Sequence, residues 1–385
     1  MSESLRIAFY TDTFLPAVDG VVISILNFRR ELMRRGHEVH VFAGGNRATK
    51  RMVMGYKDIH ITRGISFKKY PQYNLGIFPT GSALKTAMVK EFDIIHAHTP
   101  FMVGGQALLM SRLGRTPLVG TFHTMFMDQS AIREYTVGNP RMRKIILKYS
   151  WNYARFFYGR CDEVIAPSES VRSLLAGRGI GNVDVVPNSV DLERFSPRAS
   201  GAKVRSMLGI RRGERVLLYA GRVSREKKLE TMIEAAGLLR MDDIRFVIVG
   251  SGPAYDYYRG MVDRMGLTHK FNFMGFVDNR ELPRYYAAAD AFCIPSKFET
   301  QGIAPIEAMA CGKPVVGADY LALKELISNG KNGEKFRAGD PKACARKIRK
   351  VIYNIESYKT MLDTAKRYSV KATTDRLLEA YYKLL

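Results

Sequence analysis

The sequence lacks the features that mark a membrane-spanning or exported protein. No unbroken apolar run approaches the about 20 residues that a helix needs to cross a bilayer, so we expect no transmembrane segment. The start, MSESLRIAFYTDTF, has neither the basic segment nor the small-residue cleavage site of a signal peptide. We therefore expect a cytoplasmic protein.

Cysteine is scarce, and the usual metal and nucleophile patterns are missing. The four cysteines lie far apart and form no CxxC pair, which favours reduced thiols and argues against a zinc site. There is no metal-spaced His/Cys cluster, no Asp-x-Asp pair for a divalent ion and no Ser-His-Asp order. We expect an activity that needs no metal and no other cofactor.

Acidic residues are few relative to basic ones. Lysine and arginine number 60 against 37 acidic residues, a net charge of +23, and both halves of the chain share the excess. Such a balance favours nucleic acid, an anionic lipid surface or a phosphorylated ligand as partner, and composition alone does not choose among them. Because the aromatic residues are dispersed through apolar runs and no nucleic-acid-binding motif is legible, we expect no nucleic-acid partner.

What the sequence does have is a regular alternation of short apolar runs with helix-length amphipathic segments. Continuous apolar strands separated by helices predict a parallel sheet that is covered on both faces. The runs of the first half are at 6–10, 38–43, 93–98, 117–122, 163–168 and 183–188.

A polar, turn-rich stretch, PNSVDLERFSPRASG (187–201), interrupts the alternation and is a candidate linker. The alternation then resumes, with apolar runs at 215–221, 244–252, 270–276, 290–296 and 313–318. We predict an α/β protein with two Rossmann-like, doubly wound domains that face each other across a cleft. The predicted parts are residues 1–192, residues 193–365, and a C-terminal helix, 366–385, that packs back on the first domain.

Two cations follow the first strand of the second half, in YAGRVSREKKLE (219–230). Arg222 offers a planar fork of donors and Lys227 a point charge, and together they suit a diphosphate. The alternative is an ordinary solvated basic loop. The nearby VIVGSGP (247–253) lacks the third glycine of a dinucleotide fingerprint, so we reject NAD binding, although Gly250 can still approach a nucleotide.

Two glutamates eight positions apart lie in FETQGIAPIEAMACGKPVV (298–316). Proline and glycine surround Glu299, which predicts a loop, whereas Glu307 falls inside an alanine-rich helix. Ionised carboxylates accept hydrogen bonds, and the paired hydroxyls of sugars are natural donors. The alternative for Glu307 is stabilisation of a helix start by a negative charge. His123 follows another predicted strand. It is a candidate site residue, and the alternative is a purely structural role.

These features occur together in an order that resembles the retaining GT-B glycosyltransferases of family 4. The resemblance covers nearly the whole chain and is most specific at the Glu-x7-Glu spacing, the cation pair, VVPNSVD (185–191) and EAMACGKPVV (307–316). It implies transfer of a sugar from a nucleotide sugar, with retention of anomeric configuration by front-face attack and without a metal. Nucleotide-sugar 2-epimerases share the architecture and remain an alternative.

The resemblance also implies a role for each site residue. Arg222 and Lys227 would bind the donor phosphates, Glu307 the ribose hydroxyls and Glu299 the hydroxyls of the sugar, while His123 would contact the sugar near the reacting carbon. The implied donor-binding positions are Gly20, Arg222, Lys227, Gly250, Val277, Glu299, Thr300, Gln301, Gly302 and Glu307. The implied catalytic side chains are His123, Glu299, Arg222 and Lys227, and Asp128 is the implied acceptor-binding residue.

Within the family, three stretches are similar to diacylglycerol glucosyltransferases: YTDTFLPAVDGVVISI (10–25), TFHTMFMDQS (121–130) and ETQG (299–302). The similarity implies transfer of glucose from UDP-glucose to a membrane glycerolipid. A polyprenyl-linked glycan, an inositol phospholipid and a soluble sugar remain alternative acceptors. One departure weakens the phosphate-loop role of Gly20, because Asp19 stands where many relatives have a second glycine.

A basic and aromatic segment, NPRMRKIILKYSWNYARFFYGR (139–160), independently suggests a membrane surface. At helical spacing its apolar residues form one face and its basic residues a stripe beside it, as in helices that lie on anionic bilayers. The alternative is a core helix with a solvated face. We expect a peripheral protein on the inner face of the membrane; the oligomeric state is not predicted.

Overall fold

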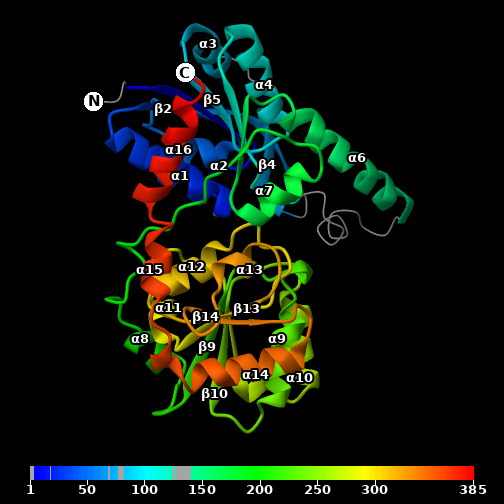
Figure 1. Ribbon diagram of the computed structural model, residues 1–385, viewed down its shortest axis with the longest axis vertical. Coiled ribbons are helices and arrows are strands. Elements are labelled where there is room, and N and C mark those ends of the chain that lie inside the picture. The colour runs from blue at the N-terminus through cyan, green and yellow to red at the C-terminus, as the bar shows by residue number, and fades with distance from the viewer. Residues whose placement is uncertain (1–3, 18, 68–69, 77–81, 124, 126–139) are drawn as a thin grey trace. The chain divides into compact units, whose positions relative to one another are not determined.

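The computed structural model describes residues 4–17, 19–67, 70–76, 82–123, 125 and 140–385 (Figure 1). The chain forms two compact units. Unit 1 comprises residues 1–189 and 370–385, and unit 2 comprises residues 190–369. The sequence predicts these boundaries after residues 192 and 365.

Unit 1 is built on one sheet of eight strands in the order β4-β3-β2-β1-β5-β6-β7-β8. All neighbouring pairs are parallel except β3 and β4, which pair antiparallel at one edge. The strands are β1 (Arg6–Thr11), β2 (Glu38–Gly45), β3 (Ile59–Phe67), β4 (Tyr70–Gly76), β5 (Ile94–Ala97), β6 (Leu118–Thr121), β7 (Glu163–Ala166) and β8 (Val183–Val185). Six of them fall on the apolar runs of the first half.

Helices cover both faces of this sheet, because side chains alternate between the faces along each strand. In β1, Ile7 and Phe9 enter one core cluster, and Ala8 and Tyr10 enter another. The first cluster includes residues of α1 and α16, and the second includes residues of α4, α6 and α7. The helices are α1 (Gly20–Arg34), α2 (Arg47–Met52), α3 (Ser82–Val89), α4 (Met102–Gly114), α6 (Pro140–Tyr158), α7 (Glu169–Ala176) and α16 (Val370–Tyr382).

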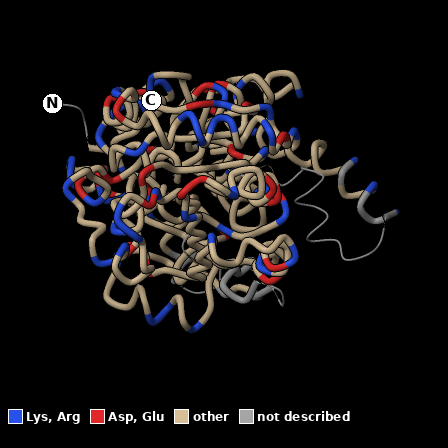
Figure 2. Tube along the Cα trace, turned by 90° about the horizontal axis from the view of Figure 1, so that it is seen from below, with Lys and Arg blue, Asp and Glu red and all other residues tan. Residues whose placement is uncertain are grey.

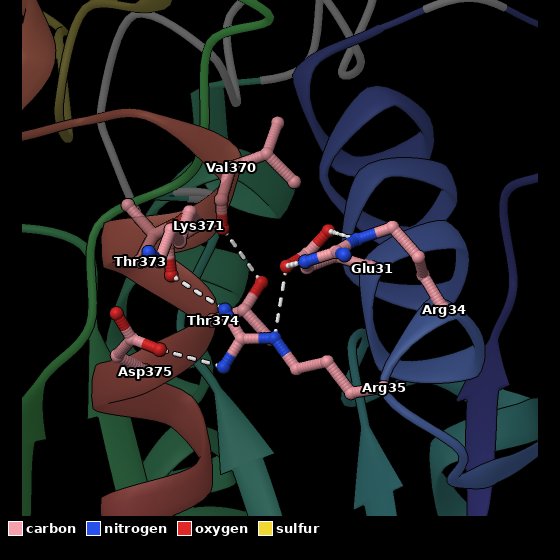
Figure 3. A network of polar contacts seen from close by, with 8 residues as sticks. All are labelled: Glu31, Arg34, Arg35, Val370, Lys371, Thr373, Thr374 and Asp375. Atoms are coloured by element: carbon pink, nitrogen blue, oxygen red, sulfur yellow. Dashed lines mark hydrogen bonds and ion pairs between the residues drawn. The ribbon is translucent and has the colours of Figure 1, made fainter.

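The C-terminal helix α16 packs against α1, and a polar network joins the two helices (Figure 3). Arg35 lies at its centre. Its guanidinium donates to Glu31 Oε1 at 2.8 Å, to Asp375 Oδ1 at 2.6 Å and to the Lys371 carbonyl oxygen at 3.1 Å. The hydrogen bond from Arg34 and the charge of Arg35 lower the pKa of Glu31 to about 2, although partial burial opposes this. The network therefore stays ionised over the whole physiological range.

Apolar packing contributes more than these ion pairs to holding α16 in place. Leu377 and Tyr381 are fully buried in the core cluster that also contains Val22, Ile25 and Phe28 of α1. We expect Leu377→Ala to lower the free energy of unfolding by about 2–5 kcal/mol, the usual cost of a cavity at a buried leucine. Chemical denaturation measures this loss. The exposed ion-pair variant Asp375→Asn is the control and should change stability by less than about 1 kcal/mol.

Unit 2 has a six-stranded parallel sheet in the order β11-β10-β9-β12-β13-β14. Its strands are β9 (Arg215–Ala220), β10 (Ile244–Val249), β11 (Phe271–Gly275), β12 (Ala291–Ile294), β13 (Val315–Ala318) and β14 (Gly333–Phe336). The first five fall on the apolar runs of the second half. Buried residues of the sheet and the helices form one continuous core.

The helices of unit 2 pack on this sheet in two groups. The helix α9 contacts α10 and α14, whereas α12 contacts α15 and α11 contacts α8. They are α8 (Ala202–Met207), α9 (Leu229–Leu238), α10 (Tyr255–Arg264), α11 (Leu282–Ala288), α12 (Ile303–Ala310), α13 (Ala322–Leu326), α14 (Pro341–Ile352) and α15 (Met361–Lys366), with 3-10 turns η1 (Arg225–Lys227), η2 (Thr268–Lys270) and η3 (Ile355–Ser357).

Basic residues are spread over the chain rather than gathered in one terminal tail (Figure 2). Within the described ranges, no helix is both long and apolar enough to span a bilayer. The predicted fold class, α/β with two Rossmann-like units, is confirmed by the two largely parallel sheets. The predicted cleft between the domains stays a prediction.

Candidate functional site

The two cations of the second half follow the carboxyl end of β9. The strand ends at Ala220, Arg222 lies in the loop, and Lys227 closes the 3-10 turn η1. Arg222 Nη2 donates to Glu226 Oε1 at 2.6 Å, and Lys227 Nζ donates to Glu299 Oε1 at 2.7 Å. The Lys227 side chain is only 20% exposed, so this loop is not the solvated basic loop of the alternative interpretation.

Glu299 reaches this loop from the segment that follows the carboxyl end of β12. The carboxyl ends of β9 and β12 are neighbours because the two strands pair in parallel. The Glu299 side chain is 12% exposed. Gly302 ends the turn at φ +90°, and a Cβ there would lie 2.9 Å from Pro305 Cγ. Only glycine therefore fits at this point, directly before α12.

Glu307 lies on α12, where it is almost completely buried. The Tyr286 hydroxyl donates to Glu307 Oε2 at 2.8 Å. Burial raises the pKa of Glu307 to about 7, although the Tyr286 hydrogen bond and the charge of Arg194 oppose the shift. A carboxylate with these surroundings changes charge near neutral pH, which is unusual for a residue with only a packing role.

Tyr219 links the groups around β9 into one cluster. Its hydroxyl donates to the Arg222 carbonyl oxygen at 2.8 Å. The pKa of Tyr219 is raised well above its usual value, chiefly by burial and further by the charges of Glu299 and Glu226. We call Arg222, Glu226, Lys227 and Glu299 the charged cluster: two cations, each paired with a carboxylate, at the carboxyl edge of the sheet. Ligands of doubly wound proteins bind at this edge.

The glycine at position 250 has a structural reason of its own. A Cβ at Gly250 would lie 1.9 Å from the Gly221 carbonyl oxygen, so the close approach of the loops after β9 and β10 requires glycine here. Val277 follows β11 and packs partly against the core of unit 2. Thr300 and Gln301 lie in the turn between Glu299 and Gly302, with Gln301 buried. Ligand contacts at these positions stay predictions.

In unit 1, Gly20 is the first residue of α1, as the predicted phosphate loop requires. The Asp19 side chain caps the helix, however, and accepts hydrogen bonds from the amides of Val21 at 3.0 Å and Val22 at 2.9 Å. These amides are among those that a bound phosphate would use at a helix start. The departure noted at Asp19 thus has a physical meaning: a protein carboxylate already occupies part of this end.

His123 follows β6 and stacks on His98, which follows the neighbouring strand β5. His98 Nδ1 and His123 Nε2 are 3.1 Å apart. Burial lowers the pKa of His123 to about 3, although a hydrogen bond with the Asn188 side chain opposes the shift. His123 is therefore a neutral imidazole at physiological pH. Asp128 lies outside the described residues.

Three contributors to these sites are absent from the sequence predictions. Glu226 pairs with Arg222, Tyr286 with Glu307, and His98 with His123. The sequence does carry a signal for His98, because His98 ends one apolar run and His123 follows the next, and the two runs form adjacent strands. It carries none for Tyr286, which is far from Glu307 in the chain. Among the described residues, no group of three His, Cys, Asp or Glu side chains is arranged to hold a metal ion.

The chain is similar to glycosyltransferases along almost its entire length. Residues 18–194 match the family described as Glycosyltransferase Family 4, and residues 202–368 match Glycosyl transferases group 1. The alpha-monoglucosyldiacylglycerol synthase of Streptococcus pneumoniae is 31% identical, over 84% of this chain and 74% of that protein. A GDP-mannose-dependent alpha-mannosyltransferase of Corynebacterium glutamicum is 30% identical, over 86% and 76%.

A solved structure confirms the fold. The Anabaena protein Alr3699/HepE, in complex with UDP and glucose, superposes with a TM-score of 0.76 at 22% identity, covering 99% of this chain and 100% of that one. At this identity the likeness establishes the architecture alone. The curated relatives differ in the sugar and nucleotide that their names state, so similarity by itself leaves the donor open.

Proposed function

The chain belongs to the GT-B glycosyltransferases of family 4, and from this premise we propose that it transfers glucose from UDP-glucose to a hydroxyl of a membrane glycerolipid. The charged cluster of unit 2 and the buried Glu307 support the donor half of the proposal. The two cations of the cluster suit a diphosphate, and the carboxylates of Glu299 and Glu307 suit the hydroxyls beside it. The similarity to a glucosyldiacylglycerol synthase supports the lipid half.

The protein would bind the donor at two polar parts, the ribose and the diphosphate. Glu307, once ionised, accepts hydrogen bonds from the two ribose hydroxyls, which are paired donors at the right separation for one carboxylate. Arg222 and Lys227 bind the diphosphate. Lys227 is paired with Glu299, so a bound diphosphate would replace Glu299 as the partner of Lys227. Glu299 is then released to accept hydrogen bonds from the sugar.

The reaction breaks the bond between the anomeric carbon and the leaving phosphate oxygen and forms a bond from that carbon to the acceptor oxygen. In the proposed front-face mechanism, both events occur on the same face, so the anomeric configuration is retained. The acceptor proton passes to the leaving phosphate oxygen, and the products are the glycolipid and the nucleoside diphosphate. No protein nucleophile and no metal takes part.

The protein stabilises this transition state electrostatically. Negative charge grows on the diphosphate as the bond to the sugar breaks, and Arg222 and Lys227 are fixed cations beside it. His123, which stays neutral because burial lowers its pKa, would donate or accept a hydrogen bond at the sugar without adding a charge near the cationic anomeric carbon. Asp128 and Gly20 keep their implied roles at the acceptor and the diphosphate.

The helix α6 supports a membrane-bound acceptor. Its C-terminal part is anchored in the core through Ala154, Phe157 and Tyr158. Its other aromatic and aliphatic side chains remain open: Ile145, Tyr149 and Phe156 are each more than half exposed. The core-helix interpretation therefore accounts for only part of α6, which extends away from the sheet of unit 1 (Figure 1).

Basic residues accompany this open apolar face. Arg141, Lys144 and Lys148 are exposed on the same helix. A bilayer with anionic headgroups satisfies both parts, because apolar side chains enter the interface and basic ones meet the headgroups, with about 1 kcal/mol for each basic residue near the surface. We propose that α6 seats the enzyme on the inner, anionic face of the membrane.

Charge reversal on α6 tests this role. We expect the triple variant Arg141→Glu, Lys144→Glu and Lys148→Glu to lose binding to vesicles that contain anionic phospholipid, because each substitution replaces an attraction by a repulsion. Co-sedimentation with such vesicles measures the loss. Activity on a short-chain acceptor in solution should be unchanged.

The matched control reverses three exposed lysines of unit 2, Lys203, Lys331 and Lys359. Its net charge is the same as that of the α6 variant, and it should still sediment with the vesicles. Equal loss of binding in both variants would mean that overall charge, rather than α6, attaches the protein to anionic surfaces.

A panel of nucleotide sugars tests the donor. We expect UDP-glucose to raise the unfolding temperature more than GDP-mannose, ADP-glucose or UDP-N-acetylglucosamine at equal concentration, since bound ligand stabilises the folded state by mass action. Stabilisation by none of them would contradict the nucleotide-sugar assignment. Conversion of the donor alone to its epimer would point to the isomerase alternative, and a water-soluble glycosylated product to a soluble acceptor.

A further inference from the structure

We propose that Glu226 is a positioning residue whose buried carboxylate fixes the Arg222 guanidinium in the orientation that meets the departing diphosphate. The inference rests on the proposed function of the charged cluster and adds to it a residue that contacts no substrate. It begins from an unusual placement: a buried anion next to two cations that bind an anionic ligand.

The geometry of Glu226 is that of a rigid holder. The residue lies in η1, its side chain is buried, and its Oε1 accepts from Arg222 Nη2 at 2.6 Å and from the Ser224 hydroxyl at 2.5 Å. Ser224 is itself fully buried, so two donors, the Ser224 hydroxyl and the Arg222 guanidinium, hold the same carboxylate oxygen. A guanidinium bonded in this way cannot swing freely into solvent.

Packing alone does not explain the residue. Glu226 Oε2 is buried and has no hydrogen-bond partner within the described part of the chain, an arrangement that is rare in folded proteins. Burial opposes ionisation, yet the charge of Arg222 and the hydrogen bond from Ser224 outweigh it and lower the pKa of Glu226. The group is therefore a full negative charge at neutral pH.

Glu226 would aid the reaction by fixing the orientation of the Arg222 guanidinium. Arg222 has a planar fork of five N–H donors, and fixing one nitrogen on Glu226 sets the angle of the whole fork. Donors that are already oriented stabilise growing charge without reorganising during the reaction. The same anion weakens the attraction between the cluster and a bound diphosphate, which favours release of the product. Turnover and product affinity should therefore respond to Glu226 in opposite directions.

The test is Glu226→Gln, which keeps the shape of the side chain and removes its charge. We expect kcat to fall about 10-fold, whereas the affinity for UDP, measured by calorimetry, should stay equal or become tighter because an anion has been removed. A residue that only maintains the fold would lower both together. Unchanged kcat, or weaker UDP binding in proportion to the lost turnover, would overturn the proposal.

Glu214→Gln is the matched control. Glu214 is likewise buried and ionically bonded, because Oε1 accepts from Arg245 Nε at 3.0 Å and Oε2 from the Arg211 amide at 2.9 Å. It precedes β9, so it lies at the opposite end of the strand from the charged cluster. Its variant should change the unfolding temperature by a similar amount and leave kcat unchanged.

A double variant separates the positioning role from the proposed function itself. In an Arg222→Ala background, Glu226→Gln should change kcat by less than about twofold, because its target is gone. A further 10-fold loss there would overturn the proposal. If Arg222→Ala alone kept normal turnover, the phosphate-binding assignment would fail; if it were impaired while Glu226→Gln remained fully active, only the positioning role would fail.

Discussion

Replacing either cation of the charged cluster, by Arg222→Ala or by Lys227→Ala, should lower kcat by about 100-fold or more. Removing one preorganised group that faces the developing charge typically costs this much. The substrate KM should change less, because the attraction is stronger in the transition state, where the leaving diphosphate carries more charge, than in the bound donor. Steady-state kinetics on the donor, with lipid acceptor in excess, measures both quantities.

Arg225→Ala is the control for this prediction. Arg225 lies in the same 3-10 turn as Lys227, but its guanidinium lies over the Tyr257 ring, 3.8 Å from the ring centre. Its loss should leave kcat within a few-fold of the unmodified protein. Near-normal turnover of both Arg222→Ala and Lys227→Ala would show that the cluster does not bind the leaving group.

Donor affinity should fall roughly 100-fold or more in Glu307→Ala, with a smaller change in kcat. Hydrogen bonds to a charged group contribute about 1.5–3 kcal/mol each, and the ribose contacts are made in ground and transition states alike. Titration calorimetry with the nucleotide sugar measures the loss. An unchanged dissociation constant would remove Glu307 from the binding site.

The same residue predicts a pH dependence. Since burial raises the pKa of Glu307 to about 7, the carboxylate is mostly protonated at pH 6 and mostly ionised at pH 8. Affinity for UDP-glucose, whose phosphates do not titrate in this range, should rise with pH through 7 and level off above about pH 8. In Glu307→Gln this dependence should disappear.

Stability should show the opposite trend. The native pKa of Glu307 lies above its usual value of 4.5, so between these two values the folded protein keeps a proton that the unfolded chain releases. The contribution of Glu307 to the free energy of unfolding is therefore fully present at low pH and is lost as the pH rises towards 7. Glu307→Gln should unfold at a higher temperature than the unmodified protein at pH 8, and at a similar temperature at pH 5.

Buried strands were the most predictable part of this fold. Eleven apolar runs became strands because parallel strands covered on both faces need continuous apolar sequence. The apolar runs do not predict β3, β4 and β14, all of which include polar or glycine residues, as in ITRGISF, YPQYNLG and GEKF. Strands that lie at or near an edge do not require an unbroken apolar sequence.

The candidate site was predictable where local chemistry determines position. The sequence predicts a loop at Glu299, from the proline and glycine around it, and a helix at Glu307, and both placements are confirmed. Glu226 was not predictable, because REKK is typical of a solvated turn and its burial depends on how η1 folds against β9. Non-local pairs such as Tyr286 with Glu307 likewise depend on which helices meet.

The most direct measurement is the mass of the lipid product. Unmodified protein is incubated with isotopically labelled UDP-glucose and vesicles of diacylglycerol in anionic phospholipid, and the extracted lipids are analysed by mass spectrometry. The account predicts a new lipid that is heavier than diacylglycerol by one labelled anhydrohexose, with release of UDP. Consumption of the donor with the label only in water-soluble products would contradict it.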